Sequence, residues 1–231
     1  MTTAAVAIVL AAGRGARLGL GEPKGFVGVA GRPMVARAVE AAAGCPAVAS
    51  VVVTVPAGSE ERARAATVSA KPVVVLAGGA SRHASVGAAL AAIPKDVPIV
   101  VCHDAARPFA SSQLFLAVVE ALGASDADGA IPVVPVPDTV KRVQDGFVVG
   151  TEATRAELAL AQTPQAFRAD ALRDAHEKAA REGLEFTDDA AALEWAGYRV
   201  KAVAGEPGNF KVTTMEDLAR AVELAEEPAR G

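Results

Sequence analysis

The chain has 231 residues, a formal net charge of −4 at pH 7 and 52% hydrophobic residues, of which few are aromatic. This length fits one large domain or two small ones, and alanine, valine and leucine must build most of its core. The sequence shows no long basic stripe with interleaved aromatic residues, which argues against nucleic acid as the main partner. No apolar run is long enough to span a bilayer, so we expect no membrane association.

The beginning of the sequence flows directly into an apolar run and shows no charged region followed by a cleavable apolar stretch. This pattern predicts a cytoplasmic protein without a targeting segment. The two cysteines are Cys45, near an expected helix end, and Cys102, in an apolar run. We expect two reduced thiols rather than a disulfide or a metal pair.

Short valine- and isoleucine-rich runs alternate with alanine-rich amphipathic stretches along the chain. The expected strands are residues 4–10, 50–55, 72–77, 97–104, 129–136 and 198–204. The expected helices are residues 33–44, 59–69, 85–93, 111–122, 169–182 and 188–195, with a last one starting near Thr213 at the capping sequence "TTMED". Continuous apolar strands that alternate with helices predict an α/β fold: a Rossmann-like, mostly parallel sheet with helices on both faces, in a single domain over residues 1–231.

Residues 138–158 break this alternation. The sequence "DTVKRVQDGFVVGTEATRAEL" places a hairpin-like "QDG" turn between two short strands of mixed polarity. A two-stranded ribbon by itself is marginally stable in water, so it needs a surface to pack on. A second subunit is the simplest candidate, and we expect this segment to be a dimerisation arm.

The glycine-rich stretch "LAAGRGARLGLGEPK" follows the first expected strand at residues 10–24. Glycines let backbone N–H groups approach phosphate oxygens, and Arg14, Arg17 and Lys24 can add charge-assisted contacts. The stretch lacks the Gly-Lys-Ser/Thr end of a P-loop and fits the dinucleotide fingerprint only loosely. The alternative is an ordinary glycine-rich turn with solvated arginines, which the spacing of the cations disfavours.

Asp104 ends an apolar strand, at the edge where open parallel sheets bind ligands. A single carboxylate suits Mg²⁺, which prefers few carboxylates and several phosphate oxygens. The alternative is a structural salt bridge from Asp104 to Arg107. Of the histidines, we expect His103 to be structural, His83 to lie in a loop and His176 to lie on a solvated helix face.

The stretch at residues 10–24 resembles the signature of a large nucleotidyltransferase superfamily. Six later motifs narrow this resemblance: "GGASRHASV" at 78–86, "CHDAARPF" at 102–109, "DTVKR" at 138–142, "QTPQAF" at 162–167, "TDDAAALE" at 187–194 and "GNFKVTTMEDL" at 208–218. In this order and spacing they resemble the 2-C-methyl-D-erythritol 4-phosphate cytidylyltransferases of the non-mevalonate isoprenoid pathway. The resemblance covers nearly the whole chain.

The resemblance implies transfer of CMP from CTP to a polyol phosphate, with Mg²⁺ as cofactor, in a homodimer. It implies that the catalytic cations are Arg17, Lys24 and Lys211. It implies that CTP is bound by Ala11, Ala12, Gly13, Gly15, Gly79, Ser85, Asp104 and Ala105, with Asp104 also at the metal. It implies that the polyol phosphate is bound by Arg107, Thr139, Arg155, Thr163 and Thr187, of which Thr139 and Arg155 would reach into the partner's site.

Two other functions stay open from the sequence. One is a ribitol 5-phosphate cytidylyltransferase, whose motifs overlap with these. The other is a nucleotide-sensing module without catalysis. The presence of Arg17, Lys24, Asp104 and Lys211 together weighs against the sensing module, because binding alone does not require all four.

Overall fold

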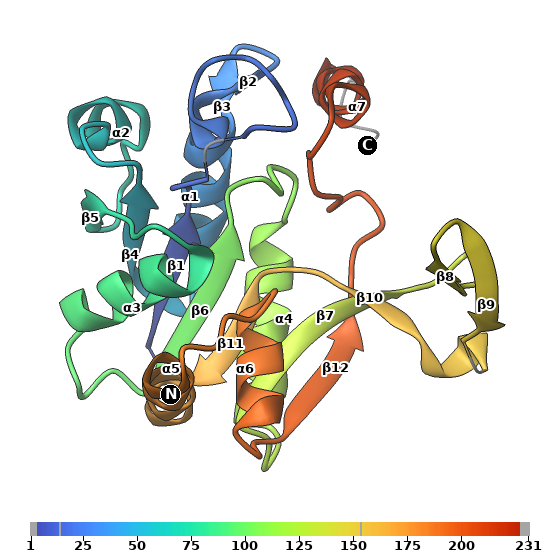
Figure 1. The fold of residues 1–231 in the computed structure, drawn as a ribbon. Helices are drawn as coiled ribbons and strands as arrows, with labels where there is room; N and C mark the ends of the chain where they lie inside the picture. Colours follow the sequence, from blue (N-terminus) through green and yellow to red (C-terminus); the bar gives the residue numbers. More distant parts are fainter. Residues whose placement is uncertain (1–3, 14, 153, 227–231) are drawn as a thin grey trace.

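Figure 1 shows a computed structural model of the protein, which describes residues 4–13, 15–152 and 154–226. Its main feature is an eight-stranded sheet in the order β10-β7-β11-β6-β1-β4-β5, with β12 also paired to β7. The strands are β1 (Ala5–Leu10), β4 (Val48–Val55), β5 (Val73–Ala77), β6 (Ile99–Asp104), β7 (Gly129–Pro135), β10 (Ala159–Ala161), β11 (Gln165–Arg168) and β12 (Val200–Ala204).

The parallel half of this sheet is built around β1, which lies between β4 and β6 and runs parallel to both. β5 continues the parallel order beyond β4. The side chains of β1 alternate between two buried clusters, with Ala7 and Val9 in one and Val6 and Ile8 in the other. A strand that is buried on both faces therefore needs the continuous apolar sequence that predicted it.

Helices cover both faces of the sheet, as predicted. The helices are α1 (Met34–Gly44), α2 (Glu60–Ala66), α3 (Arg82–Ala92), α4 (Ser112–Gly123), α5 (Ala169–Glu182), α6 (Asp189–Trp195) and α7 (Met215–Glu226). α1 and α4 supply buried residues to one cluster, and α3, α5 and α6 supply them to the other. Cys45, at the end of α1, and Cys102, in β6, are both buried and free, as predicted.

The other half of the sheet makes it mixed rather than wholly parallel. β12 runs parallel to β7, but β11 is antiparallel to both of its neighbours and β10 is antiparallel to β7. Neither β10 nor β11 was among the predicted strands. In β11 only Ala166 and Phe167 enter the apolar clusters, while Gln165 is a buried polar residue, so no apolar run announces the strand.

The predicted hairpin is present as β8 (Lys141–Gln144) and β9 (Phe147–Thr151). Asp145 and Gly146 form its turn with positive φ angles of 50° and 83°. Such a turn suits the twist of an antiparallel pair. Within the described residues these two strands pair only with each other, and Figure 1 shows them standing away from the main sheet.

The C-terminal helix α7 begins with the predicted capping box. Thr214 Oγ1 accepts a hydrogen bond from the Asp217 backbone N–H at 3.2 Å, and the Asp217 carboxylate accepts one from the Thr214 N–H at 2.9 Å. α7 packs against β2 (Gly28–Val29), with which it shares a third small apolar cluster, and β2 pairs with β3 (Arg32–Pro33). None of the helices in the described part of the chain has both the length and the apolar character needed to cross a membrane.

Candidate active site

A cavity of about 720 Å³ opens at the carboxyl ends of β1, β4, β5 and β6. Its walls come from the loops that follow these strands and from the segment before α7. This is the edge at which open α/β sheets bind ligands, and the volume lies in the range of small-molecule sites. Every residue predicted to bind CTP, to hold the metal or to be catalytic lines this cavity.

The glycine-rich loop after β1 folds back on itself along the cavity wall. The Lys24 N–H donates to the Gly13 carbonyl at 3.1 Å, and the Leu18 N–H donates to the Gly15 carbonyl at 2.8 Å. Gly15 has a φ of +68°, and a Cβ there would lie 2.9 Å from the Lys24 Cβ. Only glycine fits this turn without strain, and the turn brings Lys24 back to the end of β1. Arg14 lies outside the described residues.

Cations gather on one side of the cavity. Burial, followed by the nearby charge of Lys211, lowers the pKa of Lys24 to about 8. Arg17 also lines the cavity and adds to this repulsion, although its side chain is exposed. Asp104 acts in the opposite direction on the Lys24 pKa. Cations that lie this close together in one cavity are placed to receive a polyanion.

The loop after β5 forms the opposite wall and is fixed to the first turn of α3. Ser85 Oγ accepts from the Gly79 N–H at 3.1 Å and donates to the Ser81 carbonyl at 2.8 Å. A Cβ at Gly79 would collide with the Ala84 side chain. The helix begins at Arg82 rather than at Ser85 as predicted, because the Ser81 side chain caps it.

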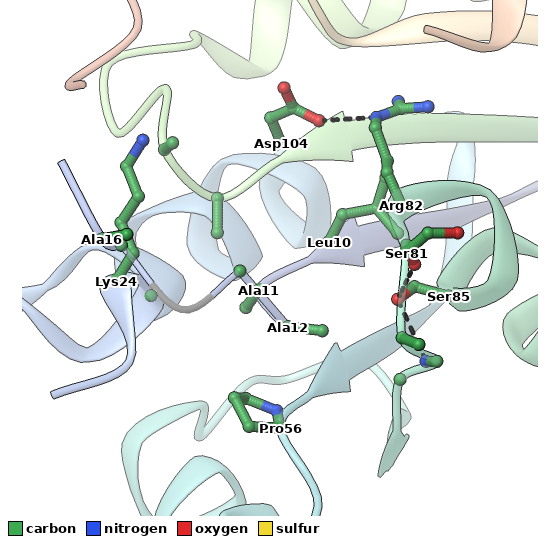
Figure 2. Close-up of a pocket in the computed structure, with 18 of the residues that line it drawn as sticks. Leu10, Ala11, Ala12, Ala16, Lys24, Pro56, Ser81, Arg82, Ser85 and Asp104 are labelled. Carbon is green, nitrogen blue, oxygen red and sulfur yellow. Dashed lines mark hydrogen bonds and ion pairs between the residues drawn. The ribbon is translucent and has the colours of Figure 1, made fainter. Parts of the chain in front are cut away.

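Asp104 lies at the end of β6, between the two walls, as the view in Figure 2 shows. Its Oδ1 accepts from Arg82 Nε at 3.3 Å and its Oδ2 accepts from Lys211 Nζ at 2.6 Å. Burial alone would raise the pKa of Asp104, but the charges of Arg82 and Lys211 hold it well below its usual range. Arg107 does not pair with Asp104. The salt bridge between these two residues, which the sequence left as an alternative, is therefore wrong.

Arg107 instead ties two backbone segments together. Its guanidinium donates to the carbonyls of Asn209 at 2.9 Å and Ala161 at 3.1 Å. Thr163 lies behind Asp104, where its Oγ1 accepts from the Asp104 N–H at 3.1 Å and bonds His103 Nδ1 at 2.9 Å. His103 is fully buried, and desolvation lowers its pKa to about 4. His103 is not among the residues that line the cavity.

The remaining residues predicted for the polyol phosphate lie outside the cavity wall. Thr139 is exposed in the segment that leads into β8. Arg155 is exposed in a short 3₁₀ helix (Arg155–Glu157) after the hairpin, and it donates to the Pro137 carbonyl at 3.1 Å. Thr187 is exposed, two residues before the start of α6. The structure thus brings together the set predicted for CTP and leaves these three residues apart from it.

The segment that carries Lys211 is held by buried amides that were not assigned from the sequence. Gln162 Nε2 donates to the Glu206 carbonyl at 2.8 Å, and Asn209 Nδ2 donates to the Thr163 carbonyl at 2.8 Å. Both amide side chains are almost fully buried. Gln162 stands in the quoted "QTPQAF" motif, but nothing local indicates a partner that is 44 residues away.

Arg82, Asp189 and His176 form a buried polar group beside Asp104 that the sequence analysis also missed. Arg82 Nη2 donates to Asp189 Oδ2 at 2.7 Å, and His176 Nε2 lies 3.0 Å from Asp189 Oδ1. The expectations for the two histidines were wrong. His176 is 5% exposed because it faces Asp189, and His83 is in α3 with its ring stacked on His176 at 4.2 Å.

Residues 5–226 match the model of one protein family, described as 2-C-methyl-D-erythritol 4-phosphate cytidylyltransferase. The chain is 48% identical over 218 residues to a protein of Rhodopseudomonas palustris named "Bifunctional enzyme IspD/IspF". A protein of the same name from Nitrobacter hamburgensis is 45% identical over 216 residues. Each alignment covers 93% of this chain, but only 54% and 53% of those proteins, so the chain spans about half the length of these relatives.

Solved structures give the same assignment over whole chains. The 2-C-methyl-D-erythritol 4-phosphate cytidylyltransferase from Thermus thermophilus is 37% identical, with a TM-score of 0.79, over 96% of this chain and 98% of that one. The 4-diphosphocytidyl-2C-methyl-D-erythritol synthase from Anaerococcus prevotii has a TM-score of 0.84 and 27% identity over the same shares. The chain therefore belongs to the 2-C-methyl-D-erythritol 4-phosphate cytidylyltransferase family.

Proposed function

We propose that this protein transfers CMP from CTP to 2-C-methyl-D-erythritol 4-phosphate. A phosphate oxygen of the polyol phosphate attacks the α-phosphorus of CTP and forms a new P–O bond. The bond between the α-phosphorus and the bridging oxygen breaks, and pyrophosphate leaves with the electron pair. The observation that carries this proposal is the placement of Lys24, Lys211 and Asp104 in one cavity of nucleotide size.

The cations supply most of the transition-state stabilisation. Negative charge grows on the departing pyrophosphate, and a fixed cation in a partly desolvated site stabilises that charge more than it stabilises bound CTP. Lys24 suits this role because its half-buried ammonium has lost part of its hydration. No general base is required, since a phosphate monoester is already an anion at neutral pH. The chain's own task is placement and charge neutralisation.

Asp104 fits a divalent cation that arrives with the triphosphate. Within the described residues, no group of three or more His, Cys, Asp or Glu side chains is arranged to hold a metal by itself. Mg²⁺ is commonly held by one or two carboxylates together with substrate phosphates. Each Asp104 oxygen accepts one hydrogen bond, which leaves lone pairs free at the cavity. Bound there, Mg²⁺ would act as a Lewis acid on the phosphates.

The second substrate would be held partly by a neighbouring subunit. Thr139 and Arg155 lie at the base of the exposed hairpin and outside the cavity of their own chain. A homodimer in which each hairpin reaches the other chain would bring them to the partner's cavity. Residues 138–158 would then be the dimerisation arm, and Arg107, Thr163 and Thr187 would complete the polyol site. The cytoplasmic location expected from the sequence stays a prediction.

Release of pyrophosphate from CTP tests this function. We expect turnover with methylerythritol phosphate and much slower turnover with ribitol 5-phosphate. CTP should be preferred over ATP by a wide margin, because a site that hydrogen-bonds one base leaves costly unpaired groups with another. Preference for ribitol 5-phosphate would identify a different acceptor for the same chemistry. CTP binding without any transfer would indicate a nucleotide-sensing module and contradict the proposal.

A further inference from the structure

Arg82 connects two carboxylates that lie on different elements. It is the first residue of α3, and its Nε donates to Asp104 at the cavity while its Nη2 donates to Asp189 in the interior. The Arg82 side chain is 22% exposed and the Asp189 side chain is 1% exposed. Figure 2 shows Arg82 reaching from the start of α3 toward the end of β6. The guanidinium thus joins the cavity to the core.

Both carboxylate oxygens of Asp189 have hydrogen-bond partners. Oδ2 accepts from Arg82, and Oδ1 lies 3.0 Å from His176 Nε2. Because an ionised carboxylate only accepts hydrogen bonds, His176 Nε2 donates to Asp189, and His176 Nδ1 is buried without a hydrogen-bond partner among the described residues. Burial alone would raise the pKa of Asp189, but the charge of Arg82 holds it well below its usual range. A buried carboxylate is costly unless it is paired in this way.

The backbone around Asp189 is anchored independently of Arg82. The preceding residue, Asp188, caps α6 by accepting from the Ala191 N–H at 3.0 Å. Its other oxygen accepts from Gln165 Nε2 of β11 at 2.8 Å. The position of Asp189 is therefore set by α6 and the central sheet, and Asp189 holds the guanidinium from the side away from the cavity.

This arrangement limits how Arg82 can contact Asp104. A guanidinium fork matches both oxygens of a carboxylate when it is free to turn. Here Nη2 is held by Asp189, so only Nε contacts Oδ1 of Asp104, and Oδ2 pairs with Lys211. Without the charge of Asp189, Arg82 could rotate onto both oxygens of Asp104 and compete with Lys211.

We propose that Asp189 is a positioning residue that acts through Arg82, keeping Oδ2 of Asp104 available to Lys211 and to the incoming substrate. This inference rests on the proposed function, because it gives Asp104 its task. Asp189 itself does not line the cavity. His176 bonds this carboxylate from α5. The side chains therefore form a continuous chain of hydrogen bonds from α5 to the cavity.

The main test is Asp189→Asn, which keeps the shape and removes the charge. We expect kcat to fall roughly 10–100-fold, as for other groups that orient a reacting residue through a neighbour. CTP affinity and binding stoichiometry, measured by calorimetry, should stay close to those of the wild-type protein. In the Arg82→Gln background the same substitution should have little further effect on kcat, because the two side chains act in series. A crystal structure of Asp189→Asn should show Arg82 on both oxygens of Asp104.

The matched control is Leu193→Ala, which opens a cavity in the same helix without touching Arg82. It should lower Tm but leave kcat unchanged well below Tm. If Asp189→Asn does not fold, Arg82→Lys takes its place, since a point charge cannot hold both carboxylates and should lower kcat as well.

Normal kcat in Asp189→Asn, or a loss of kcat that matches a loss of CTP-binding stoichiometry, would overturn the inference. So would normal kcat in Arg82→Lys. An inactive wild-type protein would overturn the proposed function instead, and the orientation of Arg82 in the variant crystal would still decide the positioning claim.

Discussion

The cavity and the hairpin are opposite kinds of surface on the same chain. Around the cavity, Asp104 is bonded on both oxygens and the surrounding loops are tied to the sheet and to α3. In the hairpin, Phe147 is 75% exposed and Val148 is 64% exposed. Large apolar side chains that are exposed on one short hairpin indicate an interaction surface. One chain thus supplies every cavity residue predicted for CTP, while the described strands of the hairpin pair only with each other and leave apolar side chains exposed.

The largest expected effect comes from removing a cation from the cavity. Lys24→Ala should lower kcat by about 10²–10³-fold, the usual cost of losing one preorganised charge partner in a transition state. The dissociation constant of CTP should change far less, because Lys24 acts on charge that develops during transfer. Steady-state kinetics and calorimetry measure the two quantities. The exposed Lys95 gives the control Lys95→Ala, which should be normal. Weaker CTP binding with normal kcat would mean that the glycine-rich loop binds CTP but does not contribute to catalysis.

A charge placed among the exposed apolar side chains of the hairpin tests the other surface of this comparison. If the proposed homodimer forms through the hairpin, Phe147→Asp should raise its dissociation constant by about 30-fold or more, as expected when an aromatic anchor of an interface is replaced by a charge. Activity should fall at protein concentrations where the variant is monomeric, while CTP binding should persist. Analytical ultracentrifugation and calorimetry follow the two properties. Val68→Asp is the matched control, because Val68 is 90% exposed elsewhere on the surface. Equal dimerisation of both variants would exclude the hairpin as the interface.

A pH profile sharpens the account of the cavity. The pKa of Lys24 is lowered to about 8 by burial and by Lys211, so its charged form is present below that pH and is lost above it. We therefore expect kcat/KM for CTP to fall as pH rises through about 8. Lys24→Arg should remove this fall, since arginine stays protonated. A wild-type profile that is level until about pH 10, the ordinary lysine range, would contradict the assignment.

The smallest expected effect lies at the capping box of α7. Thr214→Ala removes the hydroxyl that accepts from the Asp217 N–H, and should lower the free energy of unfolding by about 1 kcal/mol. kcat should not change, because Lys211 is held by Asp104 and by the backbone bond from the Val212 N–H to the Ala106 carbonyl. Urea unfolding and steady-state kinetics check the two statements. A lower kcat would show that the cap also positions the cavity wall.

The sequence predicted the features whose signals are local. Continuous apolar runs marked β1, β4, β5 and β6, and the glycine and cation spacing marked the loop that ends at Lys24. The turn at Asp145 and Gly146 marked the hairpin. Such local signals predict which element forms. They also predict which side chains follow each strand at the edge of the sheet where ligands bind.

The features that the sequence did not predict depend on pairings between distant segments. The bonds of Arg82 to Asp189 and of Lys211 to Asp104 each span 107 residues. β11 was missed because its place in the sheet comes from two neighbouring strands and not from its own apolar content. His176 looked solvated because no local pattern shows that a buried carboxylate lies opposite it.

The central claim is that the nucleotide site of one chain works with the hairpin region of another. Mixing Arg155→Ala protein with Lys24→Ala protein under conditions of subunit exchange tests it most directly. Each variant alone should be nearly inactive. If the sites are composite, random exchange places one intact site in half of the dimers, so activity should recover to about a quarter of the wild-type value. No recovery, with exchange demonstrated by labelled subunits, would contradict the account and confine Arg155 to its own chain.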